Sequence, residues 1–202
     1  MALYDRYLAW RVRFAPGEPP AHVALVITER DLLERGAYGS LERFVELAFE
    51  VGADRVTVYV SVLDEAVLET VSRSVESLSF PREVAIRDPR STDPADAPIQ
   101  INLGLGGKEE FAAAVRSIAG DVADGDLTPA EITEADVEDR LIFADEPDLV
   151  IKTGEERLSD FMIWQSVYSE LYFTDVNWRD VRDREFLRAV LAYKRRTRRF
   201  GE

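Results

Sequence analysis

The apolar residues of this chain form two kinds of pattern, short continuous runs and stripes spaced at helical intervals. Continuous runs predict strands buried on both faces of a sheet, and they cover residues 22–27, 56–60, 84–87 and 147–153. A further strand is expected over residues 99–105, where glycines end it. Stripes that return every three or four residues predict helices, and they cover residues 1–15, 40–51, 64–78, 108–123, 133–141 and 183–200. The first of these helices is expected to have one apolar face, made of Leu3, Tyr7, Leu8 and Val12. Residues 161–173 are apolar nearly all round, which predicts a buried helix.

Strands that alternate with helices predict an α/β fold with a mainly parallel central sheet flanked by helices. The segment 88–98 contains three prolines and no large apolar residue, so it predicts an internal loop. Because the strand–helix pattern continues beyond this loop, we expect a single domain over residues 1–202. Residues 1–19 would form its N-terminal helix and a Pro-rich lead-in.

Composition narrows the chemistry that this domain can perform. Its 202 residues include 25 Lys and Arg against 39 Asp and Glu, a formal net charge of −14. This charge argues against nucleic acid as a partner, because duplex binding depends on neutralising phosphates. The chain has no Cys and a single His, His22, so disulfides, thiolate metal sites, Cys nucleophiles and His-rich metal sites are excluded.

Hydropathy and charge also bear on the compartment. No apolar run approaches the roughly 20 residues that span a bilayer, and the start, MALYDRYLAWRVRF, is too charged for a secretory signal. We therefore expect a cytoplasmic protein. An acidic excess with only three Lys resembles the proteins of halophilic archaea, and an ordinary acidic cytosolic protein is the alternative.

The loop after the last long predicted strand carries the most informative polar residues. Open parallel sheets bind ligands beyond the carboxyl ends of their strands, and the segment KTGEERLSDF (152–161) lies at such an end. It places Lys152, Arg157 and Ser159 in one loop that leads into a predicted helix. Two cations, a hydroxyl and helix-start amides suit a phosphate or diphosphate. A solvated surface loop is the plainer interpretation.

The same region resembles a known family. The segment PDLVIKTGEERLSDFMIWQSVYSELYFTDVNWRD (147–180) is similar to the C-terminal signature of the cis-prenyltransferases, the undecaprenyl diphosphate synthase family. The end YKRRTRRFGE (193–202) resembles the family's R-R-F-G close. Residues 20–27 and 101–119 resemble its first strand and its Y-G-G-R segment.

The resemblance implies a dimeric α/β protein that acts in polyprenyl diphosphate synthesis from isopentenyl diphosphate. Active members use magnesium to neutralise the leaving diphosphate and a long apolar tunnel to hold the growing chain. By matching positions, the resemblance assigns substrate binding to Lys152, Arg157, Ser159, Arg199 and Gly201. Glu170 matches the family's magnesium-associated carboxylate, although it could simply pair with an Arg of the final helix. In heteromeric members the R-x-G element reaches the partner's substrate.

Departures from the family pattern affect the catalytic centre. Thr28 stands where active members have the Asp of D-G-N, and Glu29 and Arg30 take the places of the Gly and Asn. A neutral hydroxyl cannot offset a divalent cation and two phosphates. The Gly that lets this loop fold tightly in active members is also missing. The stretch 64–99 is too short for the usual tunnel wall, and the Y-G-G-R segment is reduced to Leu105–Lys108.

We therefore expect a non-catalytic or regulatory subunit of a heteromeric cis-prenyltransferase, similar to the Nogo-B-receptor-like class. It would help to make a polyprenyl (dolichol-type) diphosphate by contributing Arg199 and Gly201 to a catalytic partner that bears D-G-N. Mg²⁺ would bind in the active complex, and a second copy of the chain is the alternative partner.

Two other hypotheses stay open. The chain could be a self-sufficient short-chain enzyme in which Glu29, Asp31 or Glu170 holds magnesium, or a diphosphate- or lipid-binding module without transfer activity. In each case residues 1–15 could contact the inner face of a membrane as a peripheral helix.

Overall fold

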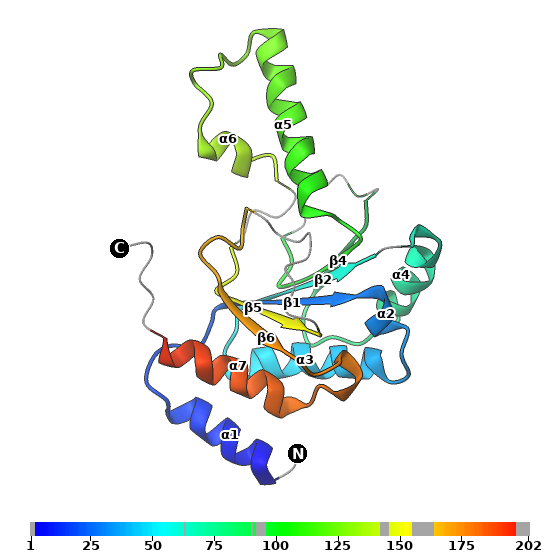
Figure 1. Ribbon diagram of the computed structural model, residues 1–202, viewed down its shortest axis with the longest axis vertical. Helices are drawn as coiled ribbons and strands as arrows, with labels where there is room; N and C mark the ends of the chain where they lie inside the picture. The colour runs from blue at the N-terminus through cyan, green and yellow to red at the C-terminus, as the bar shows by residue number, and fades with distance from the viewer. Residues whose placement is uncertain are drawn as a thin grey trace.

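The centre of the protein is a six-stranded sheet whose strands are all parallel, in the order β3-β4-β2-β1-β5-β6 (Figure 1). The computed structural model describes residues 3–62, 64–89, 91, 96–141, 146–154 and 164–196. The strands are β1 (His22–Thr28), β2 (Arg55–Ser61), β3 (Val84–Arg87), β4 (Ile99–Leu103), β5 (Leu149–Thr153) and β6 (Glu170–Thr174). This architecture confirms the expected α/β fold class.

Helices cover the two faces of the sheet unequally (Figure 1). The helices are α1 (Leu3–Phe14), α2 (Glu29–Leu32), α3 (Ala37–Val51), α4 (Leu68–Glu76), α5 (Gly107–Asp124), α6 (Glu134–Glu138) and α7 (Asp183–Arg195), with short 3₁₀ turns at Glu65–Val67 and Trp178–Asp180. Helices α3 and α7 lie side by side beneath the sheet, and α1 lies against α7. Helices α5 and α6 project from the opposite side.

The main core lies between the sheet and the layer of α3 and α7. Val23, Leu25 and Ile27 of β1 point into it and are at most 2% exposed. Trp178 anchors the chain before α7, because its indole nitrogen donates to the Ala37 carbonyl at 3.1 Å and its ring is fully buried. This contact fixes the start of α7 against the start of α3.

Several sequence predictions need correction. The buried helix expected over 161–173 is wrong where the structure describes it, because residues 164–168 form turns and Glu170–Thr174 form β6. Pairing with the edge of β5 satisfies the backbone of this segment, and its Tyr and Phe side chains suit a strand. Helix α3 begins at Ala37 rather than Ser40, after Gly36 in a left-handed conformation.

The ends of the chain also differ from the prediction. In α1, Leu8 and Val12 are buried as expected, whereas Leu3 and Tyr7 are exposed. Helix α7 is described to Arg195, and the remainder of the predicted helix, from residue 197, lies outside the described residues. No helix in the described ranges combines the length and apolarity needed to cross a bilayer.

Candidate functional site

The strand register brings a row of side chains together near the carboxyl edge of the sheet. Val26 pairs with Lys152 on one side and with Tyr59 on the other, and Asn102 pairs with both Tyr59 and Arg87. Paired residues of parallel strands point to the same face. This row therefore faces the side that carries α5, opposite the main core, and the loops after β1 and β5 leave from the same edge.

Thr28 is the last residue of β1 and also the cap of α2. Its backbone N–H and its hydroxyl both donate to one carboxylate oxygen of Asp31, each at 2.8 Å. The Asp31 N–H returns a contact to the Thr28 hydroxyl at 3.4 Å, which completes a capping box. The hydroxyl and the nearest carboxylate are thus engaged in starting a helix.

The same Thr-x-x-Asp capping box occurs a second time, at the start of α6. Thr133 and Asp136 start α6 with the same two donations, each at 2.7 Å, on an exposed part of the surface. The box at Thr28 has the geometry of a structural helix start.

Glu170, the candidate magnesium ligand, lies far from Thr28. Glu170 pairs with Leu149 and Leu149 with Val23, so Glu170 is level with the amino end of β1. Five residues of strand, about 16 Å, separate that level from Thr28. The Glu170 carboxylate instead forms an ion pair with Arg196, just after α7. This pairing with an Arg of the C-terminal region is the structural alternative that the sequence left open.

These carboxylates do not fit a magnesium site. Thr28 is neutral, Asp31 accepts two hydrogen bonds from Thr28, and Glu170 is paired with an arginine. Glu29 is 4% exposed, and one of its carboxylate oxygens has no hydrogen-bond partner. Among the side chains that the structure describes, no group of three or more Asp, Glu or His is arranged to hold a metal ion. Mg²⁺ requires several oxygen ligands around one point, which this part of the chain does not supply.

The substrate-binding candidates are only partly described. Lys152 is half-buried on β5 in the row defined above, and the next residue, Thr153, is buried with a hydroxyl that has no partner. Gly154 then turns the chain with a φ of 80°. The other candidates, Arg157, Ser159, Arg199 and Gly201, lie outside the described residues.

The face that carries the row is rich in buried polar side chains, which the sequence analysis did not identify. They include His22, Thr57, Arg87, Gln100 and Asn102, each at most 7% exposed. Glu110 of α5 is also buried and lies near Gln165, with 3.5 Å between amide nitrogen and carboxylate. The sequence IQINL (99–103) could have revealed this polar face, because its residues alternate strictly and every second one is polar.

His22 is the only histidine and is held neutral within this polar face. Its Nε2 lies 2.8 Å from the Thr57 hydroxyl, and its Nδ1 lies 3.3 Å from the Glu146 carbonyl. Because a carbonyl can only accept, Nδ1 carries the proton and Nε2 accepts from Thr57. Burial lowers the pKa of His22 from 6.5 to about 4. His22 is therefore a structural hydrogen-bonding residue at neutral pH.

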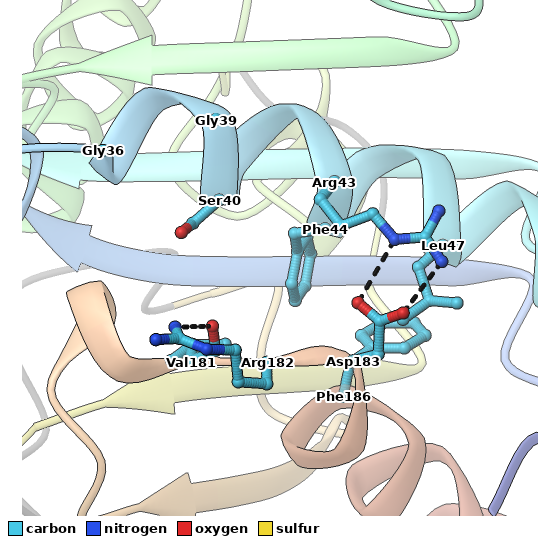
Figure 2. A pocket seen from close by; sticks show the side chains of 10 residues that line it. All are labelled: Gly36, Gly39, Ser40, Arg43, Phe44, Leu47, Val181, Arg182, Asp183 and Phe186. Atoms are coloured by element: carbon cyan, nitrogen blue, oxygen red, sulfur yellow. Dashed lines mark hydrogen bonds and ion pairs between the residues drawn. The ribbon is translucent and has the colours of Figure 1, made fainter. Parts of the chain in front are cut away.

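A cavity of about 250 Å³ lies on the other side of the sheet, between α3 and the start of α7 (Figure 2). Phe44 and Phe186 line it, and Arg43 crosses its rim to Asp183 with two hydrogen bonds of 3.2 and 3.0 Å. The hydrogen bonds that Arg43 donates to Asp183 and Glu50 raise its pKa above the ordinary value. Since the charge of Arg43 is compensated, this cavity is a poor match for a diphosphate.

Comparison with known proteins identifies the family. The family model described as "Putative undecaprenyl diphosphate synthase" matches residues 67–201. The tritrans,polycis-undecaprenyl-diphosphate synthase (geranylgeranyl-diphosphate specific) of Methanopyrus kandleri is 30% identical over 246 residues, which covers 98% of this chain and 90% of that protein. The chain therefore belongs to the undecaprenyl diphosphate synthase family of cis-prenyltransferases.

The chain covers only part of several curated relatives. An isoprenyl transferase of Geobacillus kaustophilus is 41% identical over 155 residues, which is 75% of this chain but 57% of that protein. The chain thus spans about half the length of several curated relatives that it matches. The Methanopyrus alignment has 246 positions against 202 residues here, so at least 44 positions of it have no residue of this chain.

Solved structures support the same fold. Lavandulyl diphosphate synthase from Lavandula x intermedia, crystallised with dimethylallyl diphosphate, superposes with a TM-score of 0.70 at 24% identity, and 91% of this chain and 99% of that chain are covered. A probable undecaprenyl diphosphate synthase from Campylobacter jejuni gives 0.68 at 20% identity with the same coverage. At these identities the likeness establishes the fold.

Proposed function

We propose that this chain is the non-catalytic or regulatory subunit of a heteromeric cis-prenyltransferase that makes a polyprenyl (dolichol-type) diphosphate from isopentenyl diphosphate. The observation that carries the proposal is the Thr28–Asp31 capping box. A neutral alcohol occupies the position of the family's essential Asp, and the nearest carboxylate is used to begin α2. On this proposal, the carboxylates that hold Mg²⁺ belong to the partner.

The polar face of the sheet supports this assignment. A growing prenyl chain needs an apolar channel, since burying a polar group without a compensating hydrogen bond costs free energy. Next to the carboxyl edge, this face carries the buried side chains of Arg87 and Asn102, and the buried Glu110 of α5 interacts electrostatically with Arg87. Such a surface is a poor wall for a hydrocarbon, so chain growth is assigned to the partner subunit.

An exposed apolar patch offers a docking surface for that partner. On α5, Phe111 and Val115 are 37% and 45% exposed, and Phe111 stacks on Trp164 with ring centroids 5.9 Å apart. Val167 and Tyr168 follow at 66% and 57% exposure. Grouped apolar side chains of this kind mark protein interfaces. The proposed occupant is a catalytic subunit with D-G-N, and a homodimer is the alternative.

The substrate-binding candidates would serve an active site shared with the partner. Lys152, with Arg157 and Ser159, would hold isopentenyl diphosphate, and Arg199 and Gly201 would reach the partner's substrate. The acidic, Lys-poor composition adds the proposal that the source is a halophilic archaeon.

A self-sufficient short-chain prenyltransferase is the second candidate. The relatives are named as synthases and transferases, and the buried Glu29 has one carboxylate oxygen without a partner near the carboxyl edge. An enzyme of this kind would use Glu29 in place of the missing Asp. A diphosphate-binding module without transfer activity is a third possibility, which tight binding of isopentenyl diphosphate with no effect on any synthase would support.

Co-expression with a D-G-N-bearing homologue from the same source tests the proposal. We expect a stable complex whose elongation activity falls at least about tenfold when Phe200–Glu202 are deleted, because lost transition-state contacts of about 1.4 kcal/mol change a rate tenfold. Arg73→Ala, at an exposed position of α4, is the matched control and should leave activity unchanged. Failure to form a complex, or full activity of the deletion variant, would show the proposal to be wrong.

A further inference from the structure

Helix α1 has two apolar faces, and only one of them is covered. Successive residues of an α-helix are rotated by about 100°. Leu8 and Val12 lie on one side and are buried against the body of the protein, at 2% and 4% exposure. Leu3, Tyr7, Trp10 and Phe14 fall within about 60° of one another on the opposite side. We call these four residues the α1 stripe.

The α1 stripe is strongly exposed. The exposed fractions are 84% for Leu3, 50% for Tyr7, 59% for Trp10 and 65% for Phe14. Trp10 and Phe14 also contact each other, with ring centroids 5.3 Å apart. A continuous row of large apolar side chains, two turns and more in length, is costly to leave in water and indicates a surface that becomes covered.

Arginines flank the stripe on both sides. By the same rotation, Arg11 lies on one side of it, and Arg6 and Arg13 lie on the other. The guanidinium groups of Arg11 and Arg13 lie over the rings of Tyr7 and Phe14, at 5.7 and 5.9 Å from their centroids. The one acidic residue of α1, Asp5, is 9% exposed and on the buried side.

Helix α7 extends this cationic border. Arg188 lies 5.5 Å from the ring of Tyr4, and its guanidinium donates to the Tyr4 hydroxyl at 3.3 Å. Arg195 lines a hollow of about 210 Å³ together with Trp10 and Phe14. In a chain of net charge −14, this local concentration of positive charge beside aromatic rings stands apart from the overall composition.

We propose that the α1 stripe docks onto the surface of an anionic lipid bilayer, with α1 lying parallel to the membrane plane. The aromatic side chains enter the boundary between headgroups and acyl chains, a position favoured by Trp and Tyr. Arg6, Arg11 and Arg13 contact the lipid phosphates. This inference does not depend on the proposed function.

Charge complementarity selects the bilayer over a second copy of the chain. Two α1 helices that paired through their stripes would bring Arg6, Arg11 and Arg13 near the same residues of the other copy, with no exposed acid on α1 to compensate them. Like charges in such a contact are unfavourable. An anionic lipid surface supplies the opposite charge along the whole length of the helix.

Vesicle co-sedimentation tests the proposal with the 202-residue chain. We expect binding to vesicles of phosphatidylcholine with phosphatidylglycerol, and little binding to phosphatidylcholine alone or at high salt. The double variant Trp10→Asp/Phe14→Asp should lower the partition coefficient at least about tenfold, and Arg13→Ser alone about fivefold. Ile132→Asp, which alters a 39% exposed apolar residue remote from α1 in sequence, is the matched control and should bind as the parent does.

Fluorescence quenching by brominated lipids tests whether the α1 stripe itself contacts the bilayer. Lipids brominated on their acyl chains should quench the parent protein in anionic vesicles through Trp10, which is exposed on the stripe. Of the other two tryptophans, Trp178 is fully buried, and Trp164 stacks on Phe111 of α5, on the opposite side of the sheet from α1 (Figure 1). Trp10→Phe should keep the vesicle binding and lose most of the quenching, and circular dichroism should confirm that each variant is folded. Absence of binding to anionic vesicles, equal binding of the folded Trp10→Asp/Phe14→Asp variant, or a dimer that this variant dissociates without any lipid dependence would overturn the proposal.

Discussion

Replacing Thr28 by Asp, the residue that the family resemblance implies at this position, provides a sharp prediction. The substitution Thr28→Asp introduces that side chain and places a second carboxylate where the Thr28 hydroxyl now donates to Asp31 at 2.8 Å. We expect the isolated variant to remain inactive, because the polar face of the sheet is unchanged. We also expect it to be less stable than the parent.

The size of the stability loss follows from the geometry. The hydrogen bond within the capping box contributes about 1 kcal/mol. Two carboxylates about 4 Å apart repel by about 1 kcal/mol in water and about 4 kcal/mol at an effective dielectric constant of 20. Both side chains are half-exposed, so the lower part of that range applies. The predicted loss is about 2 kcal/mol at neutral pH, and it should shrink at low pH because protonating either carboxyl removes the repulsion.

Urea denaturation at several pH values measures this loss, and radiolabelled isopentenyl diphosphate measures activity. Thr133→Asp, in the exposed capping box of α6, is the matched control. It should destabilise the protein less, because solvent screens the exposed pair. Prenyl transfer by isolated Thr28→Asp would refute the reasoning, as would a variant at least as stable as the parent at neutral pH.

Three further predictions concern single side chains. The folded state favours neutral His22, so the free energy of unfolding should fall by up to about 3 kcal/mol as the pH drops from about 6.5 to about 4. His22→Gln should remove that slope in urea titrations. Glu170→Gln should cost about 0.5 kcal/mol by losing the partly exposed pair with Arg196 and should leave the activity of the assembled complex within about twofold; a tenfold loss in a folded complex would contradict the structural role. Asn102→Leu should raise the free energy of unfolding by about 1 kcal/mol, since both amide atoms of this buried side chain lack partners in the described structure; thermal denaturation that shows a lower melting temperature would contradict this.

The strands were predictable because their determinants are local. Runs such as HVALVI and VTVYV are rich in β-branched residues that suit a buried parallel strand, and β1 and β2 extend one or two residues beyond these runs. The strand β6 was mistaken for a helix because apolar residues all round suit either element. Its assignment depends on pairing with β5, a contact that the local sequence does not reveal.

The site was less predictable than the fold. Sequence matching placed Thr28 at the position of the family's Asp and Glu170 at that of its magnesium-associated carboxylate. The register shows that the two residues lie at opposite ends of the strands. The capping role of Thr28 could have been predicted, because Thr-x-x-Asp is a helix-start pattern, and the same pattern starts α6 at Thr133. The outward face of α1 was missed because Leu3 and Tyr7 were grouped with the buried residues.

The most direct test of the central claim is the incorporation of labelled isopentenyl diphosphate by the purified chain, alone and with its D-G-N-bearing homologue, in the presence of Mg²⁺ and an allylic diphosphate. We expect no product from the chain alone and long-chain product from the mixture. Product formation by the chain alone, at a rate comparable with that of the mixture, would contradict the claim.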